Sequence, residues 1–225
     1  MVESLFNVIK GCITQDRSTL YTALPARVVS FNGHTVTCEI MINKMMTNGQ
    51  EIELPPLVDV IAQFPHAGGF CFTVPIKAGD EGLVIFSSRC IDGWYASGNK
   101  SIPLDNRMHD LSDGIFIVGV NSVPNKISDF YHDGVSMQTD DASTYIRLAQ
   151  GKIYIKGDIE HLGNCQQIGD AVLMGSYNQV GSWTQQGGMA SAKGTLQAEK
   201  IIGGGIDLEN HVHVETNKIT EKPKK

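Results

Sequence analysis

Hydrophobic and polar residues follow three different periods along this chain. Near its start, apolar residues recur three or four positions apart, at Leu5, Val8, Ile9, Cys12 and Ile13. This spacing predicts a helix with one apolar face in the segment 1–22, ending near Gln15 to Ser18. Beyond Ala26 the period falls to two, and later it lengthens to six. Apart from the opening helix, the pattern is typical of an all-β protein.

Residues 23–120 have the alternation and the turn signals of a small β-domain. Residues 27–31 and 35–40 flank Asn32-Gly33, a dipeptide typical of β-hairpin turns. Further strands are predicted at 51–54, 58–64, 70–74, 82–87 and 115–118. Short strands at this density predict a small closed barrel.

A polar segment separates this domain from later β-structure. Residues 121–142 contain Pro124 and several polar side chains, and we interpret them as a linker. The alternating pattern resumes at 144–148 and 152–156. These two strands are expected to lead into the part of the chain with the period of six.

Glycine recurs at every sixth residue within the segment 143–205. The seven positions are Gly151, Gly157, Gly163, Gly169, Gly175, Gly181 and Gly187. An apolar or small residue lies two positions after each of them, at Ile153, Ile159, Cys165, Ala171, Tyr177, Trp183 and Met189. A fixed period with a fixed apolar phase is typical of a stacked repeat, in which glycine permits a turn between short strands.

Two architectures use such a repeat, and the number of hexads distinguishes them. In a single-chain left-handed β-helix three hexads make one coil, so this chain would form little more than about two coils, whereas solenoids need about three or more units plus caps. Three intertwined chains would instead stack about seven layers whose apolar positions fill a shared axis. We therefore expect residues 143–205 to form the rod of a homotrimer.

A His-x-His motif follows the repeat, in the C-terminal segment 206–225. Alternate residues of a strand lie on one face, so His211 and His213 are expected to project together. Two imidazoles in one chain are a weak metal signal, but a trimer would bring six of them to one axis. Six nitrogen donors suit an octahedral ion, whereas zinc prefers four ligands, and imidazole also binds iron and nickel. We expect a structural metal site that ties the three chains together.

Four stretches of the chain resemble the spike proteins of contractile phage tails. They are ALPARVVSFNGHTVTCE, LPPLVDVIAQFPHAGGFCFTVPIKAGDEGLVIF, SSRCIDGWYASG and RMHDLSDGIFIVGV. These stretches are similar to the N-terminal OB-fold domain of one branch of such spikes. The resemblance implies an OB-fold barrel, a triple-stranded β-helix and a small apex with the His-x-His motif.

The same resemblance implies a metal and a function. Six histidines of the trimer, His211 and His213 of each chain, would hold one iron ion per trimer. The spike would attach to the tail hub at the tip of the baseplate and pierce the bacterial outer membrane. The basic, polar tail 214–225 departs from the pattern of a sharp apex, because it extends beyond the motif.

Composition narrows the possible partners. The formal net charge of -6 argues against a nucleic-acid partner, since such proteins usually have a basic face. No run reaches the roughly 20 apolar residues that a membrane-spanning helix needs. The five cysteines are scattered and lack metal-type spacing, so we expect free thiols in a protein assembled in the host cytoplasm.

Two enzyme classes fit parts of the pattern. A cell-wall hydrolase needs two positioned carboxylates, and the candidates are Asp110 with Asp113 and Asp140 with Asp141. Both pairs lie in turn-rich sequence, where Asp is common for turn formation alone. A hexapeptide-repeat acyltransferase would need more coils and a histidine base, for which His161 is the histidine within the repeat. We expect a structural protein and not an enzyme.

A binding function is the remaining alternative. A trimeric receptor-binding adhesin or tail-fibre tip would also be rich in β-structure. Such tips usually display aromatic side chains to sugars, but this chain has no aromatic residue after Trp183. The pattern therefore favours a piercing spike over an adhesin.

Overall fold

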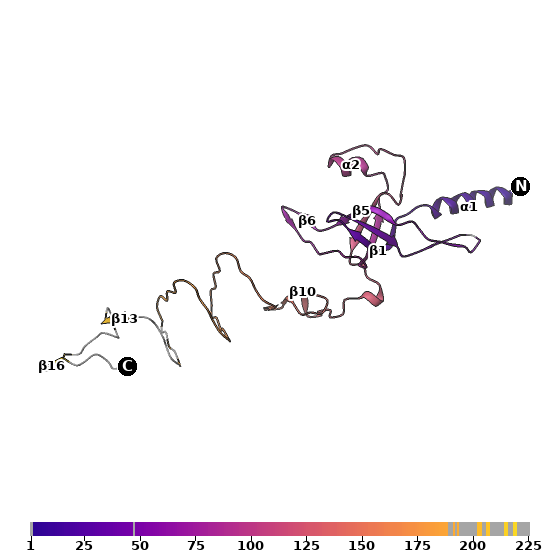
Figure 1. The fold of residues 1–225 in the computed structure, drawn as a ribbon. Helices are drawn as coiled ribbons and strands as arrows, with labels where there is room; N and C mark the ends of the chain where they lie inside the picture. Colours follow the sequence, from indigo (N-terminus) through magenta and orange to yellow (C-terminus); the bar gives the residue numbers. More distant parts are fainter. Residues whose placement is uncertain are drawn as a thin grey trace. The chain divides into compact units, whose positions relative to one another are not determined.

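The computed structural model describes residues 2–46, 48–188, 191 and 193, together with the backbone pairs 202–203, 206–207, 214–215 and 218–219. The chain forms two compact units, Met1–Glu160 and His161–Lys225. The first unit contains the helices and most of the strands (Figure 1). Each unit is described separately below.

The predicted N-terminal helix is confirmed as α1 (Val2–Ser18). Leu5, Phe6, Ile9 and Ile13 on its apolar face are all exposed. The helix ends where Thr19 and Leu20 turn back to the carbonyls of the last turn. Among the described residues, no helix combines the length and the apolar character needed to cross a lipid bilayer.

A closed five-stranded barrel forms the centre of the first unit (Figure 1). Its strands are β1 (Ala23–Phe31), β2 (Thr35–Ile40), β5 (Leu57–Gln63), β9 (Gly114–Val118) and β8 (Glu81–Phe86), in that spatial order. Strands β1 and β8 pair to close the barrel, and β5 and β9 form its one parallel pair. The predicted barrel is thereby confirmed, and its five closed strands are OB-like.

The barrel core consists of alternate apolar residues that point inward. Val36, Cys38, Val84 and Phe116 are wholly buried in it. Burial raises the pKa of the Cys38 thiol to about 11, so this cysteine remains a neutral, small apolar side chain. Gly82 lies beneath the Phe116 ring, and a Cβ there would clash with that ring. The close approach of β8 and β9 thus requires a glycine.

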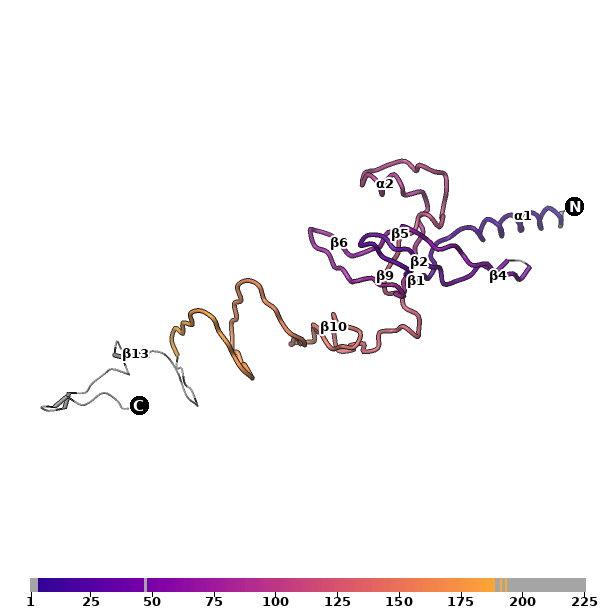
Figure 2. The backbone as a smooth tube through the Cα atoms, in the orientation of Figure 1, coloured from indigo at the N-terminus to yellow at the C-terminus, as the bar shows by residue number. Residues whose placement is uncertain are grey.

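Two hairpins project from the barrel (Figure 2). One pairs β3 (Lys44–Met45) with β4 (Glu51–Ile52), and the other pairs β6 (His66–Ala67) with β7 (Phe70–Cys71). The strands expected at 51–54 and 70–74 are therefore present but only two residues long. Between β8 and β9 the chain leaves the barrel and forms the short helix α2 (Asp92–Ser97), which the sequence pattern does not predict.

A separate three-stranded antiparallel sheet follows the barrel. After the 3-10 turn η1 (Val123–Asn125), the strands are β10 (Gly134–Gln138), β11 (Tyr145–Ala149) and β12 (Lys152–Lys156). β11 and β12 confirm the strands expected at 144–148 and 152–156. β10 lies within the segment interpreted as a linker, so the β-structure begins earlier than the sequence pattern indicates.

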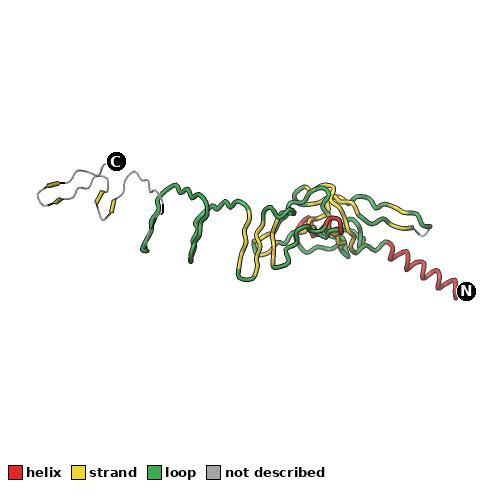
Figure 3. The backbone as a smooth tube through the Cα atoms, turned by 90° about the horizontal axis from the view of Figure 1, so that it is seen from below, coloured by secondary structure: helices red, strands yellow, loops and turns green. Residues whose placement is uncertain are grey.

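Beyond β12 the backbone of residues 157–188 contains no strand (Figure 3). Four two-residue strands lie nearer the C-terminus. They pair as β13 (Ile202–Gly203) with β14 (Ile206–Asp207), and as β15 (Val214–Glu215) with β16 (Lys218–Ile219). The intertwined shaft and the metal-bound apex therefore remain predictions.

Candidate functional site

The glycine repeat has a regular backbone conformation. Gly157, Gly163, Gly169, Gly175 and Gly181 have φ angles between 113° and 124°. Residues with a Cβ rarely adopt this region, so each of these positions favours glycine. The sequence period of six is thus also a conformational period, as expected for one turn per hexad.

The apolar residues of the repeat are exposed in the single chain. Ile168, Met174 and Val180, each just before a glycine, are 92%, 95% and 95% exposed. Tyr177 and Trp183, two positions after a glycine, are each 70% exposed. Soluble proteins rarely leave a series of large apolar side chains almost fully open to water in one segment, and such exposure usually marks an interface.

A buried carboxylate joins the barrel to the segment that leaves it. Glu81 on β8 is 8% exposed and accepts a hydrogen bond from the backbone N–H of Ser122 at 2.6 Å. It also accepts hydrogen bonds from the Ser122 hydroxyl at 3.1 Å, the Asn125 amide at 2.7 Å and Arg27 at 3.3 Å. These bonds, with the Ser122 N–H first, lower the pKa of Glu81 to about 2. Glu81 is therefore charged at neutral pH and holds the connector, residues 119–133 between β9 and β10, against β8.

A second polar cluster closes the excursion between β8 and β9. Asp113 is wholly buried, and both of its carboxylate oxygens accept hydrogen bonds from Arg107, at 2.7 and 3.0 Å. Its Oδ1 also accepts the backbone N–H of Ile91 at 2.9 Å. Arg107 additionally donates to Asp92 at 2.7 Å, and this bond lowers the pKa of Asp92. Arg107 thus fastens both ends of the excursion to the barrel.

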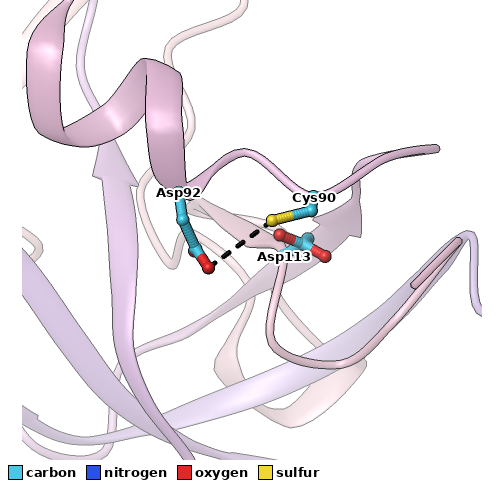
Figure 4. A group of neighbouring side chains, drawn as sticks. All are labelled: Cys90, Asp92 and Asp113. Atoms are coloured by element: carbon cyan, nitrogen blue, oxygen red, sulfur yellow. Dashed lines mark hydrogen bonds between the residues drawn. The ribbon is translucent and has the colours of Figure 1, made fainter. Parts of the chain in front are cut away.

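The same cluster contains a possible set of metal ligands. One oxygen each from Asp92 and Asp113 and the Cys90 sulfur lie within 4.8 Å of one another (Figure 4). The guanidinium of Arg107 already bonds both carboxylates and offsets one of their two negative charges. A metal ion would have to displace this internal cation, so the geometry favours a structural ion pair.

The two histidines expected to bind a metal, His211 and His213, lie outside the described residues. His161, the histidine of the acyltransferase alternative, is exposed in the second unit. The structure therefore does not place the proposed metal ligands. Among the described residues, His161 does not lie beside a group that it could activate as a base.

Three of the four candidate carboxylates of the hydrolase alternative accept hydrogen bonds within the fold. Asp110 accepts the backbone N–H of Ser112, and Asp113 is saturated by Arg107 and Ile91. Asp141 accepts hydrogen bonds from Thr139 and from the backbone of Ser143, which lower its pKa to about 2. Asp140 accepts the Ser128 hydroxyl through its backbone oxygen. The described bonds of Asp110 and Asp141 stabilise turns, and those of Asp113 hold the excursion between β8 and β9.

Sequence reasoning missed the structural roles of Glu81 and Arg107. Their partners lie 41 and 6 residues away, in segments without a periodic pattern. A glutamate in an otherwise apolar β-strand is the one local signal that could have identified Glu81, since buried charges need partners.

Comparison with known proteins gives a family match in the barrel region. No curated protein matches the chain. Residues 24–119, which span all five barrel strands from Leu24 on, match the family model described as phage protein Gp138 N-terminal domain. This match covers less than half of the chain and supports a phage structural protein associated with the virion.

Proposed function

We propose that the chain is the spike of a contractile phage tail, which acts as a homotrimer and pierces the bacterial outer membrane. The observation that carries this proposal is the glycine repeat, whose regular backbone leaves its apolar side chains exposed in one chain. The phage family of the barrel supports the same assignment. The proposed action is mechanical and involves no enzymatic step.

Three chains would remove the exposed apolar surface of the repeat. Each chain contributes a strand-sized segment per hexad, and three such segments can enclose one apolar axis. A single chain cannot do this, because residues 157–188 form no strand pairs of their own. An intertwined rod resists axial force because the chains cannot separate without breaking many layers at once.

Iron at the apex is the proposed stabiliser of the tip. His211 and His213 of three chains supply six imidazoles, and this donor set suits an octahedral transition-metal ion. The bound ion would connect three chains at the narrow end, where little apolar area remains to hold them. Its proposed role is structural, with one iron ion per trimer.

The barrel is the proposed attachment domain. It would bind the tail hub and baseplate at the tip of the virion tail, while the shaft points toward the outer membrane. Nucleic acid is not a proposed partner, because the chain carries a net charge of -6.

Metal analysis of the purified full-length chain tests this proposal. We expect one iron ion per three chains, and loss of that iron when both His211 and His213 are changed to alanine. His161→Ala is the matched control and should keep the iron. One metal per chain, or equal iron in the double variant, would contradict the proposed apex.

A further inference from the structure

The three-stranded sheet β10–β12 has two faces of opposite character. Its register aligns two apolar rows on one face, Val135–Leu148–Ile153 and Met137–Ile146–Ile155. All six side chains are between 46% and 67% exposed. Six large side chains in two aligned rows form a patch on the order of several hundred Å², the size that marks protein interfaces.

The opposite face of the sheet is polar and internally bonded. Arg147 on β11 is held by Asp129 at 2.9 Å and by Gln138 at 3.0 Å. Its guanidinium also lies over the rings of Tyr145, at 4.1 Å, and Tyr131, at 4.7 Å. The Arg147 side chain is only 15% exposed, whereas the charged Lys152 on the same face is exposed. This polar face can therefore remain in contact with water, and the apolar face is the one that a partner would cover.

The barrel does not cover the apolar rows. Val74 and Pro75 of the barrel lie near the row Met137–Ile146–Ile155, but an open groove of about 960 Å³ separates them. The groove also extends to Ile159, two positions after Gly157. Ile159 of the repeat thus lines the same groove as the row Met137–Ile146–Ile155.

The repeat alone cannot fix the alignment of three chains. If one chain slides by one hexad, six of the seven glycines again meet a glycine and the apolar phase is kept. Glycine-rich strands of this kind specify their register weakly. Of the sheet only β12, between Gly151 and Gly157, belongs to the repeat. β10 and β11 lie outside it, and the two connections of the sheet differ in length, residues 139–144 and 150–151.

We propose that the apolar face of β10–β12 binds the same face of two further copies of this chain and sets the register of the shaft. This inference rests on the proposed trimer and adds a separate contact to it. Three sheets facing one axis would bury all six apolar side chains and leave the Arg147 faces outside. The chains would then enter the hexad region already aligned.

Cross-linking of the full-length chain tests the contact. Ile146→Cys is made in a background where the exposed Cys12, Cys71 and Cys165 are changed to serine. A short bis-maleimide should join Ile146→Cys chains into a covalent dimer. Lys152→Cys, exposed on the opposite face, is the control and should give at least tenfold less dimer.

Cross-linking tests the sheet contact, and the mass of the chain in solution tests the proposed trimer. A trimer by mass whose Ile146→Cys chains do not cross-link more than the control overturns the sheet contact alone. A monomeric full-length chain overturns the proposed function and this inference together.

The register is tested through the native Cys165 of the repeat. With Cys12 and Cys71 changed to serine, Cys165 should cross-link to itself in the aligned trimer. Adding Ile146→Asp, which places a charge in the proposed contact, should lower this cross-linking several-fold in the chains that remain trimeric. Unchanged Cys165 cross-linking in such trimers would show that the register is set elsewhere.

Discussion

The carboxylate of Glu81 accepts the backbone N–H of Ser122 at 2.6 Å, across 41 residues of sequence. This bond holds the connector against the strand β8 at the point where the chain leaves the barrel. A spike must transmit force between its attachment domain and its shaft through this connector. Glu81 is therefore a residue that fastens the connector to the barrel in the proposed spike.

Loss of the Glu81 charge should loosen the connector. Glu81→Gln weakens four hydrogen bonds while keeping the size of the side chain. We expect trypsin to cleave after the exposed Lys126 several-fold faster, since cleavage follows local opening. Glu53→Gln, at an exposed position, is the control. Equal cleavage rates in both variants would show that Glu81 does not hold the connector.

Glu81 should also contribute to acid sensitivity. Its pKa is lowered from 4.5 to about 2, so its stabilising effect is present above pH 4.5 and is lost as the pH falls toward 2. The thermal midpoint of the barrel, followed by circular dichroism, should drop across this window. Glu81→Gln should start lower at pH 7 and drop less. Parallel pH profiles of the two proteins would disprove this role.

Arg107 should be essential for barrel stability. Arg107→Ala leaves the wholly buried Asp113 without its cation. Removing one partner of a fully buried pair costs about 3–5 kcal/mol, and because Arg107 is 21% exposed we expect a loss at or below the lower end of that range. Urea unfolding measures this difference. Arg89→Ala, at an exposed arginine, should change stability by no more than about 0.5 kcal/mol.

A double variant tests whether the unpaired charge of Asp113 is what destabilises Arg107→Ala. Asp113→Asn in the Arg107→Ala background removes the unpaired charge and should recover part of the stability. If the double variant is as unstable as the sum of both single variants, the two residues do not act as a pair.

Glycine should be required at the hexad positions. Gly169 has a φ of 115°, and an alanine there would cost about 1–3 kcal/mol of backbone strain in each chain. Gly169→Ala should therefore lower the temperature at which the trimer dissociates. Ser176→Ala, in the next hexad at a residue without positive φ, should have little effect. Identical dissociation temperatures would mean that the repeat does not keep this backbone in the assembly.

Local patterns predicted the parts of the fold that depend on local chemistry. The alternation around Asn32-Gly33 gave the β1–β2 hairpin, and the spacing of Leu5 and Ile9 gave α1. The glycine period gave a backbone period that the φ angles of Gly163 and Gly175 confirm. In each case the residues that determine the structure are neighbours in sequence.

Features that depend on distant contacts were not predictable. α2 has no apolar face with a helical period. The segment that contains it is held in place by the hydrogen bond from Arg107 to Asp92, 15 residues away in sequence. β10 has only Val135 and Met137 as alternating apolar residues, and its identity as a strand depends on pairing with β11. The assignment of His211 and His213 remains a prediction, because it needs contacts between chains.

The mass of the full-length protein in solution tests the central claim most directly. Each chain has a mass of 24.5 kDa, and light scattering coupled to size-exclusion chromatography measures the assembly without assuming its shape. The proposed spike predicts three chains, about three times that mass, at micromolar concentration. A stable, folded particle of 24.5 kDa would contradict it, because the apolar side chains of the repeat would then have no partner chains to cover them.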